Sequence, residues 1–215
     1  EQIKEMEELA KENRFEEADR AKRHVLALIA LQAHRLDPML YVQKDVDGLT
    51  ELQSLLQPYF PTMGVLSRIE CIDISNISGD LATGSLVVLT DGVPDRGQYR
   101  RFRIRTKQAP NDVAMIKEVL TRRLAHSEWP LPDLLIVDGG RTQVTAATSV
   151  TQRIPIIGLA KRFEEIVVPK ENQFQTIRLP LTNPAIHVLQ RIRNEAHRFA
   201  KSYHVLLRRK LLDTI

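Results

Sequence analysis

The spacing of apolar residues divides the chain from Ser67 onward into strand and helix segments. Runs rich in β-branched residues and bounded by turn residues predict strands, whereas apolar positions three or four residues apart predict helices. The predicted strands cover 68–75, 82–89, 98–106, 134–137, 154–159, 164–168 and 175–179. Helices are predicted over 112–125 and 142–150 and from Pro184 onward. This order indicates an α/β fold, a mixed sheet with flanking helices.

Two segments of this pattern are especially informative. The uninterrupted apolar run 134–137 is typical of a central parallel strand that is covered on both faces. In the last helix, Asn183 is a good N-cap and Pro184 suits the first helical position. One apolar stripe then faces the core at alternating spacings of three and four: Leu189, Ile192, Ala196, Phe199, Tyr203 and Leu206.

The first 64 residues have a different character. Residues 1–35 read as two short helices, too small to bury a core, so we expect them to dock on a partner, on a second copy or on the main domain. Residues 36–64 read as a linker rich in proline and glycine, with a possible short helix at 49–56. The predicted organisation is therefore a helical hairpin at 1–35, a linker at 36–64 and one domain at 65–215.

Composition excludes several classes of protein. The 215 residues are 43% hydrophobic and 27% charged, which is ordinary for a soluble domain. No apolar run approaches the roughly 20 residues of a membrane span, and no signal peptide opens the chain, so we expect a cytoplasmic protein with no membrane partner. A single cysteine, Cys71, excludes a disulfide scaffold. Because the chain begins with Glu1, we expect it to be a piece of a longer protein. We expect this piece to be a monomer.

Charge is distributed unevenly along the chain. The net charge is only +4, yet residues 1–20 hold eight acidic and four basic residues. Residues 96–107 hold six basic residues and no acidic one, and residues 188–210 hold seven Lys or Arg and one acidic residue. The average thus conceals an acidic N-terminal segment and two basic segments that could meet a polyanion.

Two aspartates occupy positions that suggest a metal site. Asp73 lies within an apolar strand, and Asp138 ends a buried strand just before two glycines. Ligand sites in such sheets gather at the carboxyl ends of strands, and paired carboxylates are ordinary ligands of Mg²⁺ or Mn²⁺. Each aspartate also has a structural explanation, since Asp138 could form a turn and Asp73 could bind turn amides near Ser75.

Two further titratable residues are candidates. His197 lies at the edge of the apolar stripe of the last helix and could bind metal or transfer a proton, although a lone helical histidine is often structural. Asp112 lies in the first turn of a predicted helix, where a carboxylate also complements the helix dipole.

Basic residues of the third predicted strand could contact a phosphate backbone. Arg101, Arg103 and Arg105 alternate on one face with Arg100 on the other, and Lys161-Arg162 follow a later strand. The alternative is a solvated strand face. The chain contains neither a Walker-type phosphate loop nor a Gly-x-Ser-x-Gly nucleophile motif.

Six motifs in order resemble the C-terminal endonuclease half of the UvrC family of excinucleases. They are Ile69-Glu-Cys-Ile-Asp-Ile-Ser75, Tyr99-Arg-Arg-Phe102, Asn111-Asp112 with Ala114-Met115, Leu134-Leu-Ile-Val-Asp-Gly-Gly140 with Gln143, Ile157-Gly-Leu-Ala-Lys-Arg162, and Leu189–Ala200. The resemblance extends over about 150 residues and implies a ribonuclease-H-like fold. It also implies a metal-dependent incision on the 5′ side of a DNA lesion.

The resemblance assigns roles to residues at matching positions. It implies that Asp73, Asp138 and His197 are the catalytic and metal-binding set, with Asp112 as a further acidic position and one or two Mg²⁺ or Mn²⁺ ions. Asn76 and Arg141 depart from the family, which commonly has His and Lys there, so local DNA contacts could differ. Arg193 and Lys161, with the strand arginines, would hold the DNA.

Residues 1–35 resemble the UVR motif, which contacts the helicase UvrB. Phe15, Glu16 and Ala18 carry that match. The resemblance implies a bacterial protein. It also leads us to expect that the family's N-terminal nuclease module and its helix-hairpin-helix region lie outside these 215 residues. The alternative to a nuclease is a non-catalytic DNA-binding adaptor that recruits the helicase through its hairpin.

Overall fold

The computed structural model describes residues 38–75, 82–105, 112–160, 165–171, 173–180 and 182–212, with side chains described between 46 and 202. The chain divides into residues 1–44 and a compact unit of residues 45–215, and the fold below is that of the second unit. Within the described ranges, no helix is both long and apolar enough to cross a membrane.

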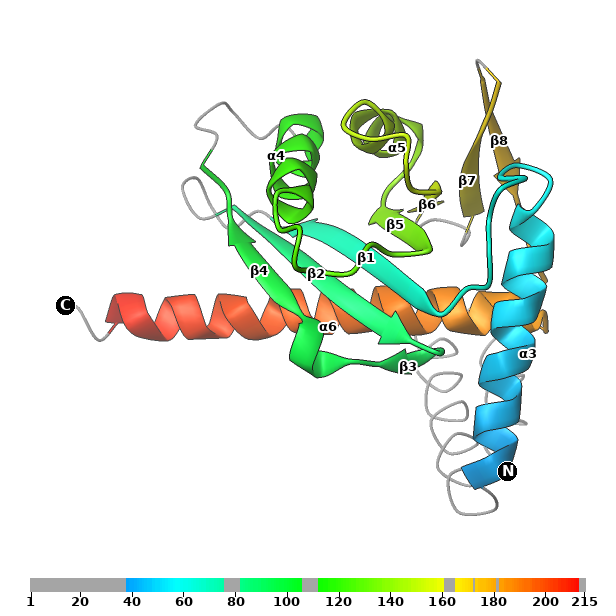
Figure 1. Ribbon diagram of the computed structural model, residues 1–215. Coiled ribbons are helices and arrows are strands. Elements are labelled where there is room, and N and C mark those ends of the chain that lie inside the picture. The colour runs from blue at the N-terminus through cyan, green and yellow to red at the C-terminus, as the bar shows by residue number, and fades with distance from the viewer. Residues whose placement is uncertain are drawn as a thin grey trace, which may run out of the picture. The chain divides into compact units, whose positions relative to one another are not determined.

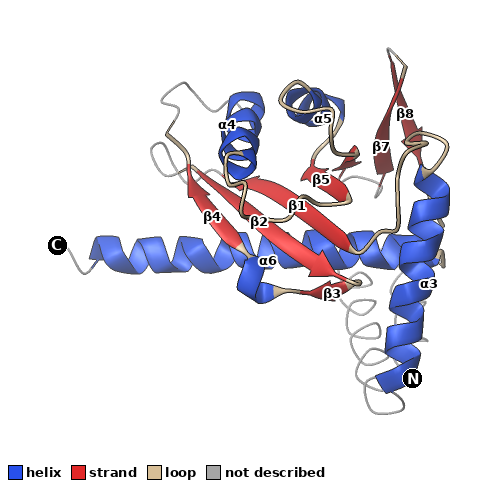
Figure 2. Cartoon of the chain, viewed as in Figure 1, coloured by secondary structure: helices blue, strands red, loops and turns tan. Residues whose placement is uncertain are grey.

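A mixed sheet forms the centre of this unit (Figure 1, Figure 2). Its strands are β1 (Arg68–Ser75), β2 (Thr83–Thr90), β3 (Val93–Pro94), β4 (Arg100–Arg103), β5 (Leu134–Asp138), β6 (Ile156–Ala160), β7 (Glu165–Lys170) and β8 (Gln173–Ile177). They lie in the order β3-β2-β1-β5-β6-β7-β8, with β4 also paired to β2. β1, β5 and β6 are parallel neighbours, and the other pairs are antiparallel. The predicted mixed sheet is confirmed.

Helices cover both faces of the sheet. α4 (Asp112–Leu124) and α5 (Arg141–Thr148) lie on one face and α6 (Pro184–Leu212) on the other, as Figure 1 shows. This double cover explains why every side chain of the apolar run Leu134–Val137 in β5 is fully buried. The prediction of a central parallel strand is therefore confirmed.

The start of α6 follows from its sequence. Oδ1 of Asn183 accepts a hydrogen bond of 2.9 Å from the backbone N–H of Ala185, and Pro184 is the first helical residue. Leu189, Ile192 and Ala196 are fully buried in the core. The described part of the predicted apolar stripe is thus confirmed, and the side chains of Tyr203 and Leu206 lie outside the described residues.

Two elements differ from the prediction. The segment predicted as a linker contains α3 (Pro38–Leu56), a 19-residue helix that is longer than the helix expected at 49–56. Leu52 and Leu56 are fully buried in the core, which explains why the helix persists despite Gly48. The strand predicted at 98–106 is shorter in the structure, where β4 covers only Arg100–Arg103. Gln98 belongs instead to a 3₁₀ turn, η1 (Arg96–Gln98), and residues 104–105 are not strand.

A close approach of backbone fixes the segment that follows β5. A Cβ atom at Gly158 of β6 would lie 2.6 Å from the carbonyl oxygen of Gly139 and 2.7 Å from Cγ2 of Val144 in α5. Real Cβ atoms do not come this close to their neighbours, so only glycine permits this packing. Gly158 therefore lets the Asp138-Gly139-Gly140 segment and α5 lie directly on β6.

Candidate active site

Asp73 and Asp138 lie side by side on neighbouring strands. The parallel register of β1 and β5 pairs Cys71 with Ile136 and Ile72 with Val137, and the two aspartates are the next residue on each strand. Residues at the same level of a parallel pair point to the same face of the sheet. The structure therefore brings together the two carboxylates that the sequence separates by 64 positions.

Burial distinguishes these carboxylates from surface acidic residues. Asp73 is only 5% exposed, and Asp138 is half-buried with its Oδ1 atom shielded from solvent. Burying a charged carboxylate is costly unless a positive charge or hydrogen-bond donors compensate it. Two such groups on adjacent strands concentrate negative charge at one point of the sheet.

α6 crosses this point and brings two basic side chains to it. Nδ1 of His197 lies 3.9 Å from Oδ2 of Asp73, and the imidazole remains about half exposed, at 53%. Arg193 lies four residues earlier on α6 and is half-buried, so it occupies the same face of the helix as His197. The face of the sheet that carries Asp73 is accordingly the face that α6 covers.

The thiol of Cys71 reports the electrostatics of this site. Burial raises the pKa of Cys71 well above 9.0, and the charges of Asp138 and then Asp73 raise it further. The positive charge of Arg193 acts in the opposite direction and lowers this pKa. The charges of Asp138, Asp73 and Arg193 thus all act on the buried thiol of Cys71.

The donor set suits a hard divalent cation. Carboxylate oxygens are the preferred ligands of Mg²⁺ and Mn²⁺, and an imidazole nitrogen is also acceptable to Mn²⁺. Among the described residues, no group of three His, Cys, Asp or Glu side chains is arranged to hold an ion. The binding of a cation would accordingly depend on the two carboxylates of Asp73 and Asp138. His197 lies close to Asp73.

Asp112 is placed differently from these residues. It is exposed in the first turn of α4, which packs on the opposite face of the sheet from α6. Among the described contacts, none joins Asp112 to Asp73, Asp138 or His197. Its role in a metal site remains a prediction.

The basic residues of the third predicted strand separate into three environments. The guanidinium of Arg101 lies 4.2 Å from the ring centroid of Phe199 and donates a hydrogen bond of 2.7 Å to Oγ of Ser202, so Arg101 faces α6. The guanidinium of Arg100 lies 5.0 Å from the ring centroid of Trp129. Arg103 ends β4 and is exposed, whereas Arg105 lies beyond the strand, where its backbone N–H donates to the carboxylate of Glu118.

Several predicted residues lie outside the described part of the chain. Lys161, Arg162 and Asn76 are among them, as are Phe15, Glu16 and Ala18 of the predicted partner-binding hairpin. The DNA contacts of the first two and the helicase contact of the last three remain predictions.

Two residues whose part in the site the sequence did not reveal, Tyr99 and Glu195, hold α6 in place. Oη of Tyr99 donates a hydrogen bond of 3.1 Å to Oε1 of Glu195, and the Tyr99 ring meets that of Phe199 edge-on at 5.1 Å. Nε of Arg198 donates to Oε2 of Glu195 at 2.7 Å, and Nε of Arg96 lies 3.5 Å from Oε1. The one signal that could have found Glu195 is its place as the single acidic residue of a basic segment.

Comparison with known proteins identifies a family. Residues 59–200 match the model of the UvrC RNAse H endonuclease domain. The chain is 42% identical over 177 residues to UvrABC system protein C of Dehalococcoides mccartyi strain BAV1, covering 76% of this chain and 28% of that protein. The same protein of Methanococcoides burtonii is 44% identical over 170 residues, covering 75% of this chain and 28% of the relative.

These relatives are much longer than the chain, which spans about 28% of their length. Among solved structures, endonuclease V of Ciona intestinalis in complex with an inosine-containing DNA is similar at a TM-score of 0.38 and 14% identity, covering 52% of this chain and 55% of that one, a likeness too distant to carry an argument. The ribonuclease-H-like fold that the resemblance implied is confirmed by the family match. By that match and by its relatives, the chain belongs to the UvrC RNAse H endonuclease domain family.

Proposed function

We propose that this chain is the endonuclease part of a nucleotide excision repair enzyme. It hydrolyses a phosphodiester bond on the 5′ side of a lesion in damaged double-stranded DNA, with Mg²⁺ or Mn²⁺ as cofactor. The observation that carries the proposal is the pairing of Asp73 with Asp138 at one level of β1 and β5, inside the segment 59–200 that matches the endonuclease family.

The two aspartates would hold the divalent cation between them. Bound there, the cation would polarise the scissile phosphate and lower the pKa of the attacking water. Asp73 pairs with Ser85 in the antiparallel ladder with β2, and it directly follows Ile72, the last residue of β1 that pairs with β5. Because it lies on a strand between two neighbours, Asp73 provides a rigid carboxylate, as precise catalysis requires.

His197 is placed to transfer a proton. Its imidazole is half exposed, so substrate and water can reach it, and its Nδ1 lies near the carboxylate of Asp73. That carboxylate would orient the ring, leaving Nε2 to face the leaving oxygen. Arg193, one helical turn away, would add positive charge beside the scissile phosphate.

Substrate and partner contacts extend this proposal. The exposed side chains of Arg103 and Arg105 would contact DNA phosphates, as would Lys161 and Arg162. Arg101 and Arg100 would contribute positive charge from their positions near α6 and Trp129. Residues 1–35 would bind the helicase UvrB.

The test replaces each carboxylate with its neutral isostere. We expect Asp73→Asn and Asp138→Asn each to reduce Mn²⁺-dependent nicking of damaged duplex DNA at least 10³-fold, with the thermal unfolding transition retained. Calorimetric titration with Mn²⁺ should show weaker binding in both variants. Asp47→Asn is the matched control, because Asp47 is an exposed aspartate of α3, outside the segment that matches the family.

Two results would contradict the proposal. Full nicking activity in either variant would remove that aspartate from the reaction. Unchanged Mn²⁺ binding in both variants, together with unchanged DNA binding and no nicking by the parent chain, would instead favour the non-catalytic adaptor.

A further inference from the structure

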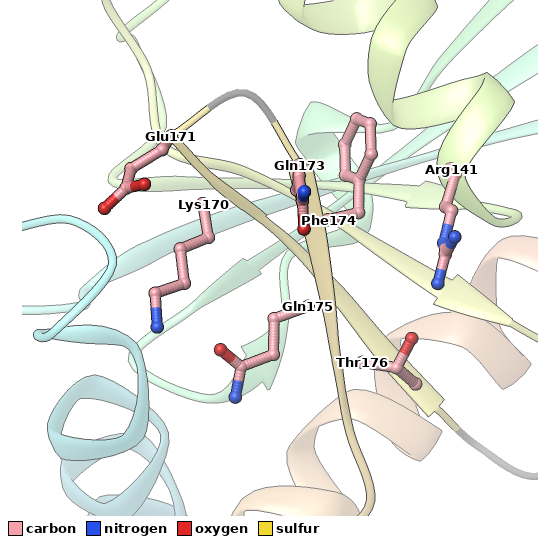
Figure 3. Close-up of a pocket in the computed structure, with 7 residues that line it drawn as sticks. All are labelled: Arg141, Lys170, Glu171, Gln173, Phe174, Gln175 and Thr176. Atoms are coloured by element: carbon pink, nitrogen blue, oxygen red, sulfur yellow. The ribbon is translucent and has the colours of Figure 1, made fainter.

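An open groove lies beside the β7–β8 hairpin (Figure 3). Its volume is about 670 Å³. One lining residue, Arg141, comes from the first turn of α5, and the other six come from the hairpin: Lys170, Glu171, Gln173, Phe174, Gln175 and Thr176. None of these residues belongs to the proposed catalytic set.

The groove begins close to the aspartate pair. Arg141 follows Asp138 by three residues, so their Cα atoms are at most about 11 Å apart. The intervening glycines are held in place, since the N–H of Gly139 donates 3.1 Å to the carbonyl of Leu159 and the N–H of Gly140 donates 3.1 Å to Oε1 of Gln143. A strand of substrate that leaves the catalytic site along this edge of the sheet therefore meets Arg141 first.

The charges of the groove suit a polyanion. Arg141 and Lys170 are both exposed, and Figure 3 shows them on opposite sides of β8, so a ligand that crosses this strand meets a cation on either side. The carboxylate of Glu171 at the hairpin tip points away from Arg141 in the same view. A guanidinium can bind a phosphate through two parallel hydrogen bonds, and a lysine ammonium binds it as a point charge.

The remaining lining residues suit a sugar–phosphate backbone better than a peptide. Gln173, Gln175 and Thr176 are exposed and offer amide and hydroxyl groups, whereas the Phe174 ring is half-buried against the core. β8 ends the strand order, so its outer edge could in principle accept a peptide strand. Peptide binding by strand addition takes its specificity from side-chain pockets, and the exposed residues of β8 are polar rather than apolar anchors.

We propose that this groove binds one strand of the nucleic acid substrate beyond the scissile phosphate, with Arg141 and Lys170 each contacting a phosphate. The proposal rests on the proposed endonuclease function and names the path of its substrate. Because Arg141 presents a guanidinium, this chain would hold the first phosphate past the site through a bidentate contact.

Binding of a fluorescent single-stranded oligonucleotide without divalent metal tests the groove independently of catalysis. We expect Arg141→Gln and Lys170→Gln each to weaken binding several-fold for every sequence tried, and to reduce the slope of log K against log salt by about 0.7. The matched controls are Arg153→Gln, in the segment between α5 and β6, and Lys117→Gln on α4, both exposed residues that do not line the groove. These controls should bind like the parent chain.

A thiol cross-link locates the strand directly. Because Cys71 is fully buried, Gln175→Cys introduces one accessible thiol among the described residues. This thiol should exchange with an oligonucleotide whose base carries a tethered mixed disulfide, forming the cross-link and releasing the small thiol of that disulfide. The control variant Lys117→Cys, whose thiol lies on α4 away from the groove, should not form this cross-link.

Equal binding by the groove variants and the controls, or equal cross-linking at positions 175 and 117, would overturn the groove while leaving the nicking test of Asp73 and Asp138 unaffected. A peptide site would be indicated instead if the affinity for the oligonucleotide did not change with salt or with the two substitutions, and if an extended peptide displaced the oligonucleotide.

Discussion

Nδ1 of His197 and Oδ2 of Asp73 are 3.9 Å apart, which links an exposed side chain of α6 to a buried carboxylate of β1. Asp73 is fixed by its strand, where it pairs with Ser85 of β2, whereas the position of His197 depends on how α6 lies across the sheet. The geometry of the site therefore depends on a helix–sheet contact. Substitutions of the site residues themselves and substitutions of the residues that hold α6 on the sheet should have different effects.

Replacing His197 by Gln should slow the chemical step while leaving DNA binding nearly unchanged. General acid–base catalysis typically contributes about 10²–10⁴-fold to a rate, so we expect a loss of that size in single-turnover nicking. His187→Gln is the matched control, because His187 is an exposed histidine about three turns earlier on α6. An equal loss in both variants, or no loss in His197→Gln, would contradict the role given to His197.

Replacing Tyr99 by Phe should destabilise the contact of α6 with the sheet. The change removes only the hydroxyl that donates to Glu195 and preserves the edge-on ring contact with Phe199. A hydrogen bond to a charged group contributes about 1.5–3 kcal/mol, so the free energy of unfolding in urea should fall by about that amount. Single-turnover nicking should fall less than in His197→Gln, because the helix is still held by its buried apolar stripe.

Tyr59→Phe provides the control for this change. Tyr59 is half-buried against the core, and the described contacts include no hydrogen bond of its hydroxyl. The control should unfold at nearly the parent's urea concentration. An equal shift in both variants would show that the Tyr99 hydroxyl has no special part in holding α6.

The fold and the acidic centre of the site were predictable from sequence because both depend on local pattern. Burial on two faces makes β5 an uninterrupted apolar run, and an aspartate in such surroundings stands out against it. Asn183 and Pro184 likewise marked the start of α6 by their own backbone preferences. These signals lie in a few consecutive residues and need no knowledge of distant contacts.

Features made by distant residues were not predictable in this way. Tyr99 and Glu195 are 96 positions apart, and nothing in either local pattern shows that they meet. The groove beside β8 joins Arg141 to Lys170, which lies 29 positions later, and no local pattern shows that they line one groove. Leu52 and Leu56 of α3 lay in a segment rich in proline and glycine, and their burial depends on a core built by later residues.

The Arg198–Glu195 pair should stabilise the fold only above mildly acidic pH. The hydrogen bond from Arg198 lowers the pKa of Glu195 below its ordinary 4.5. A carboxyl with a lowered folded-state pKa contributes stability that is present above the unfolded value and is lost as pH falls through the folded value. Unfolding free energies measured from pH 7 down to pH 2 should therefore decline less steeply in Glu195→Gln than in the parent chain.

Alkaline pH gives the complementary expectation for Tyr99. Burial and the neighbouring charge of Glu195 raise the pKa of Tyr99 well above 10.0. A tyrosine with a raised pKa contributes stability that is present below the unfolded value and is lost as pH rises toward the folded one. Above pH 10, the unfolding free energy should therefore decline less steeply in Tyr99→Phe than in the parent chain. An equal decline in both would contradict this expectation.

The buried ion pair on the opposite face of β1 should support folding without taking part in catalysis. Nε of Arg123 in α4 lies 2.9 Å from Oε2 of Glu70, and both side chains are 1% exposed. Removing one member of a buried pair typically costs about 3–5 kcal/mol when the remaining charge is left without a partner. Because NH2 of Arg68 also lies 2.7 Å from Oε1 of Glu70, we expect Arg123→Met to lower the unfolding free energy by at most about that amount, with single-turnover nicking of the folded fraction unchanged.

A double replacement separates charge from packing at this pair. Glu70→Leu combined with Arg123→Met removes both buried charges, so it should recover much of the stability lost in Arg123→Met alone. The recovery should be incomplete, because NH2 of Arg68 also lies 2.7 Å from Oε1 of Glu70 and would lose its carboxylate. The result against this expectation is additivity. If the double variant lost as much stability as Arg123→Met and Glu70→Leu lose separately, the two residues would act independently, and their ion pair would not stabilise the contact between α4 and β1.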